Sequence, residues 1–597
     1  MHANGRRGLL TATRIALVGL LLLGTPIALP AQKTVNLSPQ AWPAGEYQRF
    51  LDAQDMRRTQ AGVASGKNGA VTVAYNGFAA RAGIEALKQG GNAIDAAMTT
   101  AITQVALTAG APISYFGIMS LVYYDAATGK VYTMNAEWNT VRGETSAATI
   151  PGSINMSSAE GLRGTAVSGR TALVGGFMKG VGAAHARFGR LPLRHLFEPA
   201  IDIAERGMPV TKHLAEKFEF RHDDLARLPD TRAVFLKPDG TTYKARETFK
   251  QPSLAKTLRA IAAQGTDYMY TGPWAKKLVA AIAADGGKMT EADLTSYDVI
   301  WDEPLVAAIG DYQVYTNRSP NQGGVNLIEA QLLADAAGLT DARLPDSGPA
   351  LKKALDISLV GLLPQAALAA VFAGLDHSQD ARISTSRAEA LWKRIEAGAL
   401  PFKWKIRQSP GHSDDVVAID KDGNIAAITQ SINCVDWGRT AINIDGISIG
   451  DPASFQQAAI AAIPPGSRLP APTETGILFK GGKPVLGFAS MGSGLHIRTL
   501  QALHGIIRLG QTVDEAINAP DLLMPTASGI GRWIVRVPKG RFPKAVLDAI
   551  GYAYEEIDRD NMRFGGEGVW VGISRDPVTG LLRAASHNRN NSAAVAW

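Results

Sequence analysis

The sequence predicts an α+β protein in which antiparallel sheets are covered by helices. Hairpin patterns recur along the chain, at residues 117–135, 413–433 and 475–489. Long helical stretches separate them and dominate residues 170–300 and 325–397. At 597 residues, with 46% hydrophobic and 19% charged residues, the chain has an ordinary globular balance and ample material for large buried cores.

A strand and two helices are predicted near the start of the globular part. Residues 32–68 are polar and suggest irregular structure, and residues 70–75 suggest a strand. A helix over residues 79–90 should end at its glycine pair. Asn92 is then an N-cap for a second helix, residues 93–107, whose Ala and Ile content predicts burial on most sides.

The hairpin at residues 413–433 organises the C-terminal part of the chain. Val416–Ile419 is a short apolar strand, Asp420–Asn424 is a turn that holds an Asp-Gly pair, and Ile425–Ile432 is a second β-rich run. Ser413 stands just ahead of the first strand. Most serines in such a position are structural, so a catalytic role depends on what surrounds it.

The first 31 residues predict a secretory signal. Arg6 and Arg7 precede an apolar run, Ile15–Gly24, and the small residue Ala31 follows at the expected cut. The run is shorter than the roughly 20 residues of a membrane-spanning helix. An uncleaved membrane anchor is the alternative. We expect a periplasmic or secreted protein with no stable membrane partner once the signal is removed.

Charge and motifs argue against several classes of partner. Three of the 61 basic residues lie in the signal, which leaves 58 against 54 acidic residues, and no long basic run carries interleaved aromatics. No metal-ligand spacing and no phosphate-binding glycine motif is convincing. We therefore expect no nucleic acid, no metal and no nucleotide cofactor. The single cysteine, Cys434, cannot form an internal disulfide and is expected to be a small buried residue.

Two short stretches could carry chemistry. A cut between His412 and Ser413 would make Ser413 N-terminal, and its α-amino group, with a reference pKa near 7.7–8.0, would be a base beside its own hydroxyl. The second stretch, Ser490–Gly494, runs from a predicted strand into a predicted helix. Backbone N–H groups in such a turn are suited to an oxyanion.

Several longer stretches between about residue 68 and Trp597 form a recognisable set, among them "AARAGIEALKQGGNAIDAAMTTAI", "VYTNRSPNQGGVNLIEAQLL", "VVAIDKDGNIAAITQSIN" and "GVWVGISRDPVTGLLRAASHNRNNSAAVAW". In these stretches the chain resembles the γ-glutamyltransferase (γ-glutamyltranspeptidase) family of N-terminal-nucleophile hydrolases. This resemblance implies a four-layer αββα sandwich, made as a precursor that cleaves itself into a large and a small subunit. Here these would be residues 32–412 and 413–597.

The resemblance also implies roles for individual residues. The family's nucleophile, normally a threonine, stands seven residues before the aspartate that matches Asp420, and this count falls on Ser413. A hydroxyl and an asparagine of the next strand match Ser431 and Asn433. The glycine pair of the family's oxyanion hole falls on Gly492 and Ser493, where a backbone N–H remains at the replaced position.

The substrate pocket departs from the family pattern. The family's arginine for the glutamate α-carboxylate is missing from residues 135–138, where Glu137 would instead repel a carboxylate. The family's "S-S-M-S-P-T" loop is rebuilt as residues 470–475, with Thr473 as a substrate-binding candidate. Asp451 is the candidate to replace the acidic pair that grips the substrate amino group. The threonine that follows the family's nucleophile is Asp414 here.

Three readings follow. The first is a self-processing enzyme that cleaves a γ-glutamyl or related acyl amide, a small-molecule substrate, through an acyl-enzyme on Ser413, with transfer to water or an amine. The second keeps the chemistry with a larger or apolar acyl group, favoured by the lost arginine and by the aromatics Tyr115, Phe116 and Trp138. The third is a degenerate, non-cleaving binding protein, for which the acids after Ser413 and the serine in the oxyanion turn are the only support.

Overall fold

The computed structural model describes residues 34–56, 58–151, 166–363, 365–400, 413–523, 526–527, 533–558, 567–588 and 591–597. Residues 36–597 form one compact unit. His412 and the predicted signal, residues 1–31, lie outside the described residues. No described helix is long and apolar enough to span a membrane.

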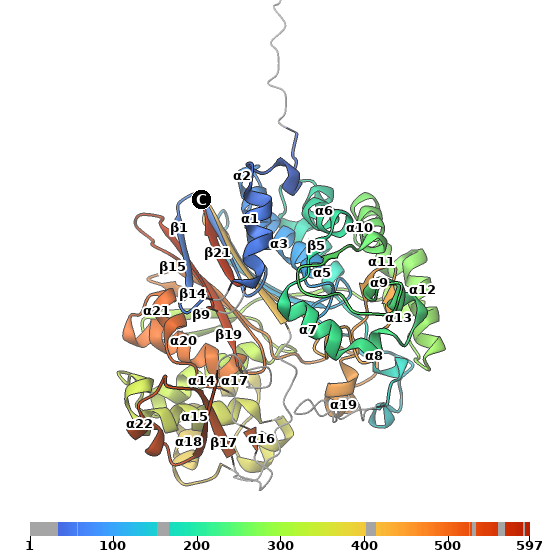
Figure 1. Ribbon diagram of the computed structural model, residues 1–597. Helices are drawn as coiled ribbons and strands as arrows, with labels where there is room; N and C mark the ends of the chain where they lie inside the picture. Colours follow the sequence, from blue (N-terminus) through green and yellow to red (C-terminus); the bar gives the residue numbers. More distant parts are fainter. Residues whose placement is uncertain are drawn as a thin grey trace, which may run out of the picture. The chain divides into compact units, whose positions relative to one another are not determined.

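Two seven-stranded antiparallel sheets form the centre of this unit (Figure 1). The first, sheet A, has the order β1 (Gly62–Gly66), β20 (Leu582–Ser586), β19 (Val569–Arg575), β15 (Lys483–Met491), β14 (Glu474–Lys480), β9 (Tyr312–Thr316) and β8 (Leu305–Ile309). The second, sheet B, has the order β21 (Ala593–Ala596), β2 (Gly69–Val73), β10 (Ser413–Asp420), β11 (Ile425–Ser431), β3 (Ile118–Asp125), β4 (Lys130–Ala136) and β7 (Ile300–Asp302).

The two sheets pack face to face through an apolar layer. Val417 and Ile419 of β10 lie in the same buried cluster as Ala489 and Met491 of β15. Gly487 allows the close approach of the sheets, because a Cβ there would lie 2.5 Å from Ile425 Cγ2 and 3.1 Å from Val417 Cγ1. β10 is also buried on its other face, so its four central residues, Val416–Ile419, are apolar in succession instead of alternating with polar ones.

Helices cover the outer face of each sheet. Sheet B is covered by α2 (Gly77–Lys88), α3 (Ala93–Leu107) and α5 (Phe177–Phe188), and α6 (Glu198–Arg206) packs on α3. In contrast, α14 (Gly323–Ala336), α15 (Gly348–Leu362), α18 (Thr385–Glu396), α20 (Leu495–Leu509) and α21 (Val513–Asn518) lie on the side of sheet A (Figure 1). The resulting order of layers is helix, sheet, sheet, helix. This is the αββα sandwich that the family resemblance implied.

The remaining elements surround these layers. The helices are α1 (Glu46–Asp52), α7 (Lys212–Phe220), α8 (His222–Leu225), α9 (Pro229–Phe235), α10 (Pro252–Gln264), α11 (Tyr268–Thr271), α12 (Pro273–Ala284), α13 (Glu291–Thr295), α16 (Gln365–Val371), α17 (Gln379–Arg382), α19 (Ala453–Ala461) and α22 (Lys544–Asp548). The short strands are β5 (Met208–Pro209), β6 (Thr248–Phe249), β12 (Asn443–Ile444), β13 (Ile447–Ser448), β16 (Thr526–Ala527), β17 (Trp533–Pro538) and β18 (Ala553–Ile557).

The predicted helix over residues 93–107 is confirmed with both of its ends. The Asn92 side chain accepts the N–H groups of Ile94 and Asp95, and the Asp95 carboxylate accepts the Asn92 N–H, which is a capping box. Every residue of this helix is buried. Two expectations were wrong. Residues 32–68 contain α1 and β1, and Ser413 is the first residue of its strand instead of preceding it.

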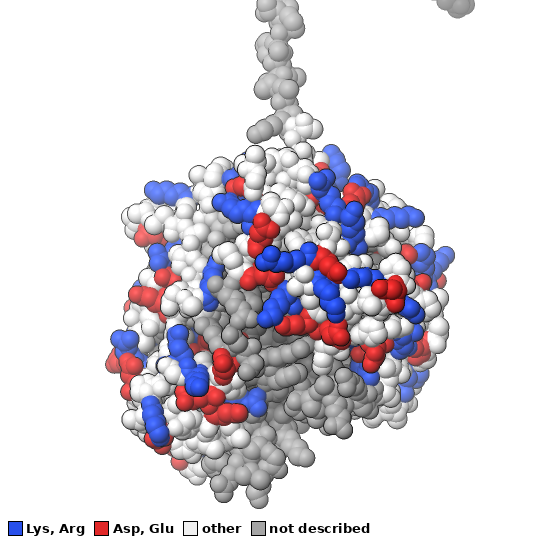
Figure 2. All heavy atoms as spheres, viewed as in Figure 1, with Lys and Arg blue, Asp and Glu red and all other residues white. Residues whose placement is uncertain are grey.

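Charged side chains are spread over the surface. On the face shown in Figure 2, the described Lys and Arg side chains are interspersed with Asp and Glu. The described part of this face therefore has a mixed charge pattern. Ion pairs also occur inside the protein, for example between the buried residues Lys217 and Asp436 at 2.8 Å.

Candidate functional site

Ser413 and Ser431 form a bonded pair at one end of sheet B. They lie directly opposite each other in the β10–β11 ladder, and Ser413 Oγ lies 2.9 Å from Ser431 Oγ, to which it donates a hydrogen bond. Ser413 is partly exposed, whereas Ser431 is buried. Because side chains alternate along a strand, Ser413 faces the same way as Val417 and Ile419, toward the opposite sheet.

Asn433 extends this pair. Its backbone N–H donates to Ser431 Oγ at 2.9 Å, and its φ of 46° lies in the left-handed region that Asn tolerates better than most residues. The Asn433 Nδ2 atom is buried and has no hydrogen-bond partner within the described part of the chain. Three of the sequence candidates, Ser413, Ser431 and Asn433, are thus brought together, and one of them has an unused donor.

The Ser490–Gly494 turn connects β15 to α20. Gly492 has a φ of 91°, and a Cβ at this position would lie 2.7 Å from the carbonyl oxygen of Glu567, so only glycine fits without strain. The Gly494 N–H donates to the same oxygen at 3.2 Å. The turn is therefore held against the chain just ahead of β19, with the N-terminus of a 15-residue helix following it.

A buried glutamate shows that the two stretches lie at the same end of the sandwich. In sheet B, Ser431 pairs with Ile118, the first residue of β3. The next residue of β3, Met119, pairs with Ala136, the last residue of β4, and Glu137 directly follows it. Glu137 Oε1 accepts a hydrogen bond from Thr473 Oγ1 at 2.9 Å. Thr473 directly precedes β14, whose first residue pairs with Ser490. At this end of the sandwich, β10 of sheet B begins at Ser413, and β15 of sheet A runs into the 490–494 turn.

Thr473 is a partner of Glu137 within a closed polar cluster. Asn321 Nδ2 donates to Glu137 Oε1 at 2.9 Å and also contacts Thr473 Oγ1. Asn135 Nδ2 donates to the other oxygen of Glu137 at 3.1 Å. Burial raises the pKa of Glu137 to about 7, against the lowering effect of these hydrogen bonds and of Arg468.

Asp451 lies beside the segment that carries Asn433. Its N–H donates to the sulfur of Cys434 at 3.3 Å, and its carboxylate accepts the N–H groups of Arg439 and Thr440 at 2.8 and 3.3 Å. Burial raises the pKa of Asp451 to about 6. Its Oδ1 atom is buried without a hydrogen-bond partner among the described residues. Cys434 is buried, as expected.

Sequence reasoning missed two features of this end of the sandwich. The first is a pair of buried acids, Asp414 and Asp415, which directly follow Ser413 and are both 0% exposed. Strand alternation could have placed Asp415 on the face of Ser413. The second is His496, in the first turn of α20, which bonds Glu474 across 2.8 Å between Nδ1 and Oε1. No local pattern in the sequence shows that Glu474, 22 positions away, is its partner.

Two other polar sites contain none of the sequence candidates. Asp521, Glu567 and His587 bring ligand atoms within 4.8 Å of one another, which is a geometry that could hold a cation. Arg498 Nη1 already lies 2.9 Å from Asp521 Oδ1, so a positive charge is supplied by the chain itself. This arrangement does not favour a metal ion.

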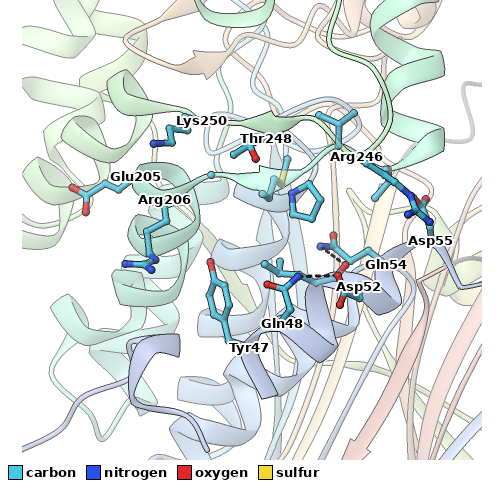
Figure 3. Close-up of a pocket in the computed structure, with 16 residues that line it drawn as sticks. Tyr47, Gln48, Asp52, Gln54, Asp55, Glu205, Arg206, Arg246, Thr248 and Lys250 are labelled. Atoms are coloured by element: carbon cyan, nitrogen blue, oxygen red, sulfur yellow. Dashed lines mark hydrogen bonds between the residues drawn. The ribbon is translucent and has the colours of Figure 1, made fainter. Parts of the chain in front are cut away.

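A surface pocket of about 950 Å³ lies between α1, the end of α6 and strands β5 and β6 (Figure 3). Tyr47 and Arg206 line it together with both acidic and basic side chains. Burial raises the pKa of Tyr47 to about 12. None of the sequence candidates lines this pocket.

Comparison with known proteins agrees with this architecture. The sequence model of the γ-glutamyltranspeptidase family matches residues 79–597. A glutathione hydrolase proenzyme of Bacillus subtilis (strain 168) is 28% identical over 574 residues, which cover 89% of this chain and 92% of that protein. An acylase ACY 1 proenzyme of Pseudomonas sp. (strain SE83) is 30% identical over 480 residues, which cover 76% of this chain and 82% of that protein.

A solved structure shares the fold. The crystal structure of a cephalosporin acylase from Bacillus halodurans superposes with a TM-score of 0.72 at 23% identity, over 94% of this chain and 99% of that chain. At this identity the likeness concerns the fold alone. Together with the match of the family model over most of the sequence, it leads to one conclusion: this chain belongs to the γ-glutamyltranspeptidase family.

Proposed function

We propose that this protein is a self-processing amide hydrolase or acyltransferase that cleaves a γ-glutamyl or related acyl amide through an acyl-enzyme on Ser413. The observation that carries the proposal is the 2.9 Å hydrogen bond between Ser413 and Ser431 at the head of β10. It lies at the end of the sandwich where the 490–494 turn closes sheet A. Relatives named glutathione hydrolase proenzyme and acylase proenzyme support the class of reaction.

Maturation would begin at the bond between residues 412 and 413. Ser413 Oγ attacks the carbonyl carbon of His412, the C–N bond breaks, and the hydroxyl proton passes to the departing nitrogen. Water then hydrolyses the resulting ester, which leaves a carboxylate on His412 and a free hydroxyl and α-amino group on Ser413. The products would be a large subunit of residues 32–412 and a small subunit of residues 413–597.

Turnover would use the same hydroxyl. The α-amino group of Ser413 takes the proton of Oγ as this oxygen attacks the substrate carbonyl. Ser431 fixes the direction of Oγ through its hydrogen bond. Backbone N–H groups of Gly492 and Ser493 would stabilise the oxyanion, and water or an amine would then take the acyl group from Ser413.

Two substrate classes compete for the acyl group. Asp451 Oδ1 and Asn433 Nδ2 are a buried acceptor and a buried donor without partners in the described structure, and they suit the amino group and carboxylate of a glutamyl substrate. Glu137 supports the other class, an acylase for a non-glutamyl group. It occupies the place of the family's arginine and is bonded to Thr473 and Asn321, so it offers no cation to a carboxylate.

We also propose that residues 1–31 direct export to the periplasm or the outside of the cell. A basic start, a short apolar run and a small residue at the cut support this. N-terminal sequencing of protein from the periplasmic fraction would test it. Recovery of the chain from the cytoplasm with residues 1–31 intact would contradict it.

Intact-mass spectrometry of the purified protein tests the main proposal. Two chains that meet between residues 412 and 413 are expected for the wild type, and a single uncut chain for Ser413→Ala. Ser413→Thr, which keeps a hydroxyl, should still mature. Anilides of γ-glutamate and of an aromatic acid then distinguish the two substrate classes. A wild-type chain that stays intact and turns over neither anilide would support a binding protein and contradict the proposal.

A further inference from the structure

Two carboxyl groups are buried next to Ser413, and no described Lys or Arg forms an ion pair with either of them. Asp414 Oδ1 accepts the N–H groups of Tyr75 at 3.1 Å and of Asp415 at 2.9 Å, and Asp415 Oδ1 accepts the hydroxyl of Thr429 at 2.7 Å. The second oxygen of each carboxyl group has no hydrogen-bond partner among the described residues. Burial without a counter-charge is costly for a carboxylate, so both groups favour the protonated form.

Their places in the strand bring them close to the start of β10. Asp415 pairs with Thr429 on the same face as the Ser413–Ser431 pair, one step further along the ladder, so about 7 Å of strand separates it from Ser413. Asp414 is adjacent to Ser413 in sequence and faces the other way, toward α3. The start of the strand is thus flanked by an acid on each face.

Charges on the neighbouring elements lie at the far end of β10. Five elements pack against this strand, namely β2, β11, α3, β15 and β19, and β2 and β11 carry no charged residue. In α3 the charge is Asp95, near the end of the strand where Ala93 N–H donates to Asp420. Lys483 of β15 lies in the turn to β14, and Arg575 of β19 lies beside the hairpin turn at Gly423.

Among the described residues, the side chains that bond the backbone or the carboxyl groups of the pair are neutral. Gln104 of α3 donates to the backbone carbonyls of Tyr75 and Asp415 at 3.2 and 3.4 Å, and Gln430 of β11 donates to Gln104 at 2.7 Å. Two titratable side chains flank β2 in sequence, Lys67 before it and Tyr75 after it. Burial raises the pKa of Asp414 and of Asp415 well above the ordinary value, and the charge of Asp415 adds to the effect on Asp414.

We propose that Asp414 and Asp415 together are the counter-ion of the α-ammonium group that cleavage creates on Ser413, and that they set its basicity. This inference rests on the proposed function, because only a cut between residues 412 and 413 produces this amine. Two neighbouring carboxyl groups do not readily ionise together, so in the mature protein the two hold one negative charge and one proton between them. One carboxylate of the two balances one ammonium.

The charge is created by an internal proton transfer. In the precursor, the nitrogen of Ser413 is an amide and both carboxyl groups keep their protons. After cleavage, the new amine takes a proton from one carboxyl group, which gives an ammonium and a carboxylate without any other reactant. The pKa of the amine should therefore lie above its reference value, about 7.7–8.0. Since the neutral amine is the base in turnover, activity should rise with pH through this higher value.

Titration of the α-amine in the mature protein tests the inference. The reactivity of the amine toward acetic anhydride is measured against pH, and the N-terminal peptide of the small chain is quantified by mass spectrometry. We expect a pKa about one to two pH units above the reference value in the wild type. The double variant Asp414→Asn, Asp415→Asn keeps the shapes and the acceptors but lacks the charge, and its amine should titrate lower by the same amount.

Asp422→Asn is the matched control. Asp422 lies in the turn of the same hairpin, its side chain is 37% exposed, and it pairs with Lys421 and Arg190. Its removal should leave the pKa of the amine unchanged. An amine that titrates at or below the reference value in the wild type would overturn the inference, and this measurement needs no variant. A wild-type chain that stays uncut would overturn the proposed function as well, so the two failures are distinguishable.

Discussion

The carboxylate of Glu137 accepts a hydrogen bond from the hydroxyl of Thr473 at 2.9 Å, and this contact joins the end of β4 in sheet B to the start of β14 in sheet A. Both residues are buried, and Asn321 contacts both of them. The contact brings the ends of two separate sheets together at the proposed nucleophile. A polar cluster in this position links the packing of the sandwich to the geometry of the site.

We expect the stability of the protein to fall as the pH rises, through Glu137. Burial raises its pKa in the folded chain to about 7, above the unfolded value near 4.5. The folded chain therefore holds a proton that the unfolded chain has lost across this window. The contribution of Glu137 to the free energy of unfolding is fully present below about pH 4.5 and declines by about 3 kcal/mol as the pH reaches 7. Glu137→Gln should flatten this part of the profile of thermal midpoint against pH.

Glu144→Gln is the control for this measurement. Arg170 donates hydrogen bonds to both oxygens of Glu144 at 2.7 and 2.8 Å and thereby lowers its pKa to about 2. Stability from Glu144 is present above its unfolded pKa, near 4.5, and is lost as the pH falls toward 2. Its removal should leave the profile above about pH 4.5 unchanged. Equal slopes for the wild type and Glu137→Gln would contradict the role given to Glu137.

Local signals in the sequence predicted much of the fold. The helix at residues 93–107 was predicted because its cap and its apolar residues are neighbours in the chain. The hairpins at 413–433 and 475–489 were predicted from their turns for the same reason. The edge strand β1 was missed, since it has five residues and gains its order from Ser586 and its neighbours in β20, far along the chain.

The proximity of Ser413 and Ser431 was predictable from the sequence, whereas the contacts of the expected pocket residues were less so. The count to Asp420 selected Ser413, and the structure bonds it to Ser431 as the matched family position suggested. Glu137 was expected only to repel a carboxylate. Its actual partners, Thr473 and Asn321, are 336 and 184 positions away, and no local pattern reveals such contacts.

Removal of the Ser431 hydroxyl should slow both maturation and turnover. Ser431 Oγ accepts from Ser413 Oγ and from the Asn433 N–H, both at 2.9 Å, so Ser431→Ala releases the nucleophile and the segment after β11. We expect a fall of about 10- to 100-fold in each rate. Time courses of precursor cleavage by mass spectrometry and of amide hydrolysis measure it.

A serine at the other end of the sandwich provides the control. Ser574 Oγ donates to the Arg583 carbonyl at 3.4 Å in β19, and Ser574→Ala should leave both rates close to those of the wild type. Ser431→Thr keeps the hydroxyl and should retain most of the activity. Normal cleavage and turnover in Ser431→Ala would show that Ser431 has no part in the reaction.

A Cβ at Gly492 should strongly reduce activity by moving the 490–494 turn. Gly492→Ala places a methyl group 2.7 Å from the Glu567 carbonyl oxygen at a φ of 91°, so the backbone must shift. We expect a loss of turnover of about 100-fold or more. Gly481→Ala is the control, because Gly481 also has a positive φ, 57°, but has nothing within 4 Å of the added Cβ. Comparable losses in both variants would mean that strain alone is responsible.

Gly361 and His496 should be energetically coupled. A Cβ at Gly361 in α15 would lie 2.0 Å from His496 Nε2, so glycine leaves the space that the imidazole fills while it bonds Glu474. Gly361→Ala should destabilise the chain by about 1–3 kcal/mol. His496→Ala should cost about 2–4 kcal/mol, because it leaves Glu474 buried with a lost partner.

In the double variant the new methyl group enters the space left by the imidazole. The loss of stability in the double variant should therefore be smaller than the sum of the two single losses by about 1–2 kcal/mol. Thermal unfolding of the four proteins in this double-mutant cycle measures the coupling. His504 provides the comparison, since it is also buried in α20 but contacts the Ala342 carbonyl at 2.9 Å. His504→Ala should combine additively with Gly361→Ala. If the losses of His496→Ala and Gly361→Ala were additive as well, the close contact between His496 and Gly361 would be contradicted.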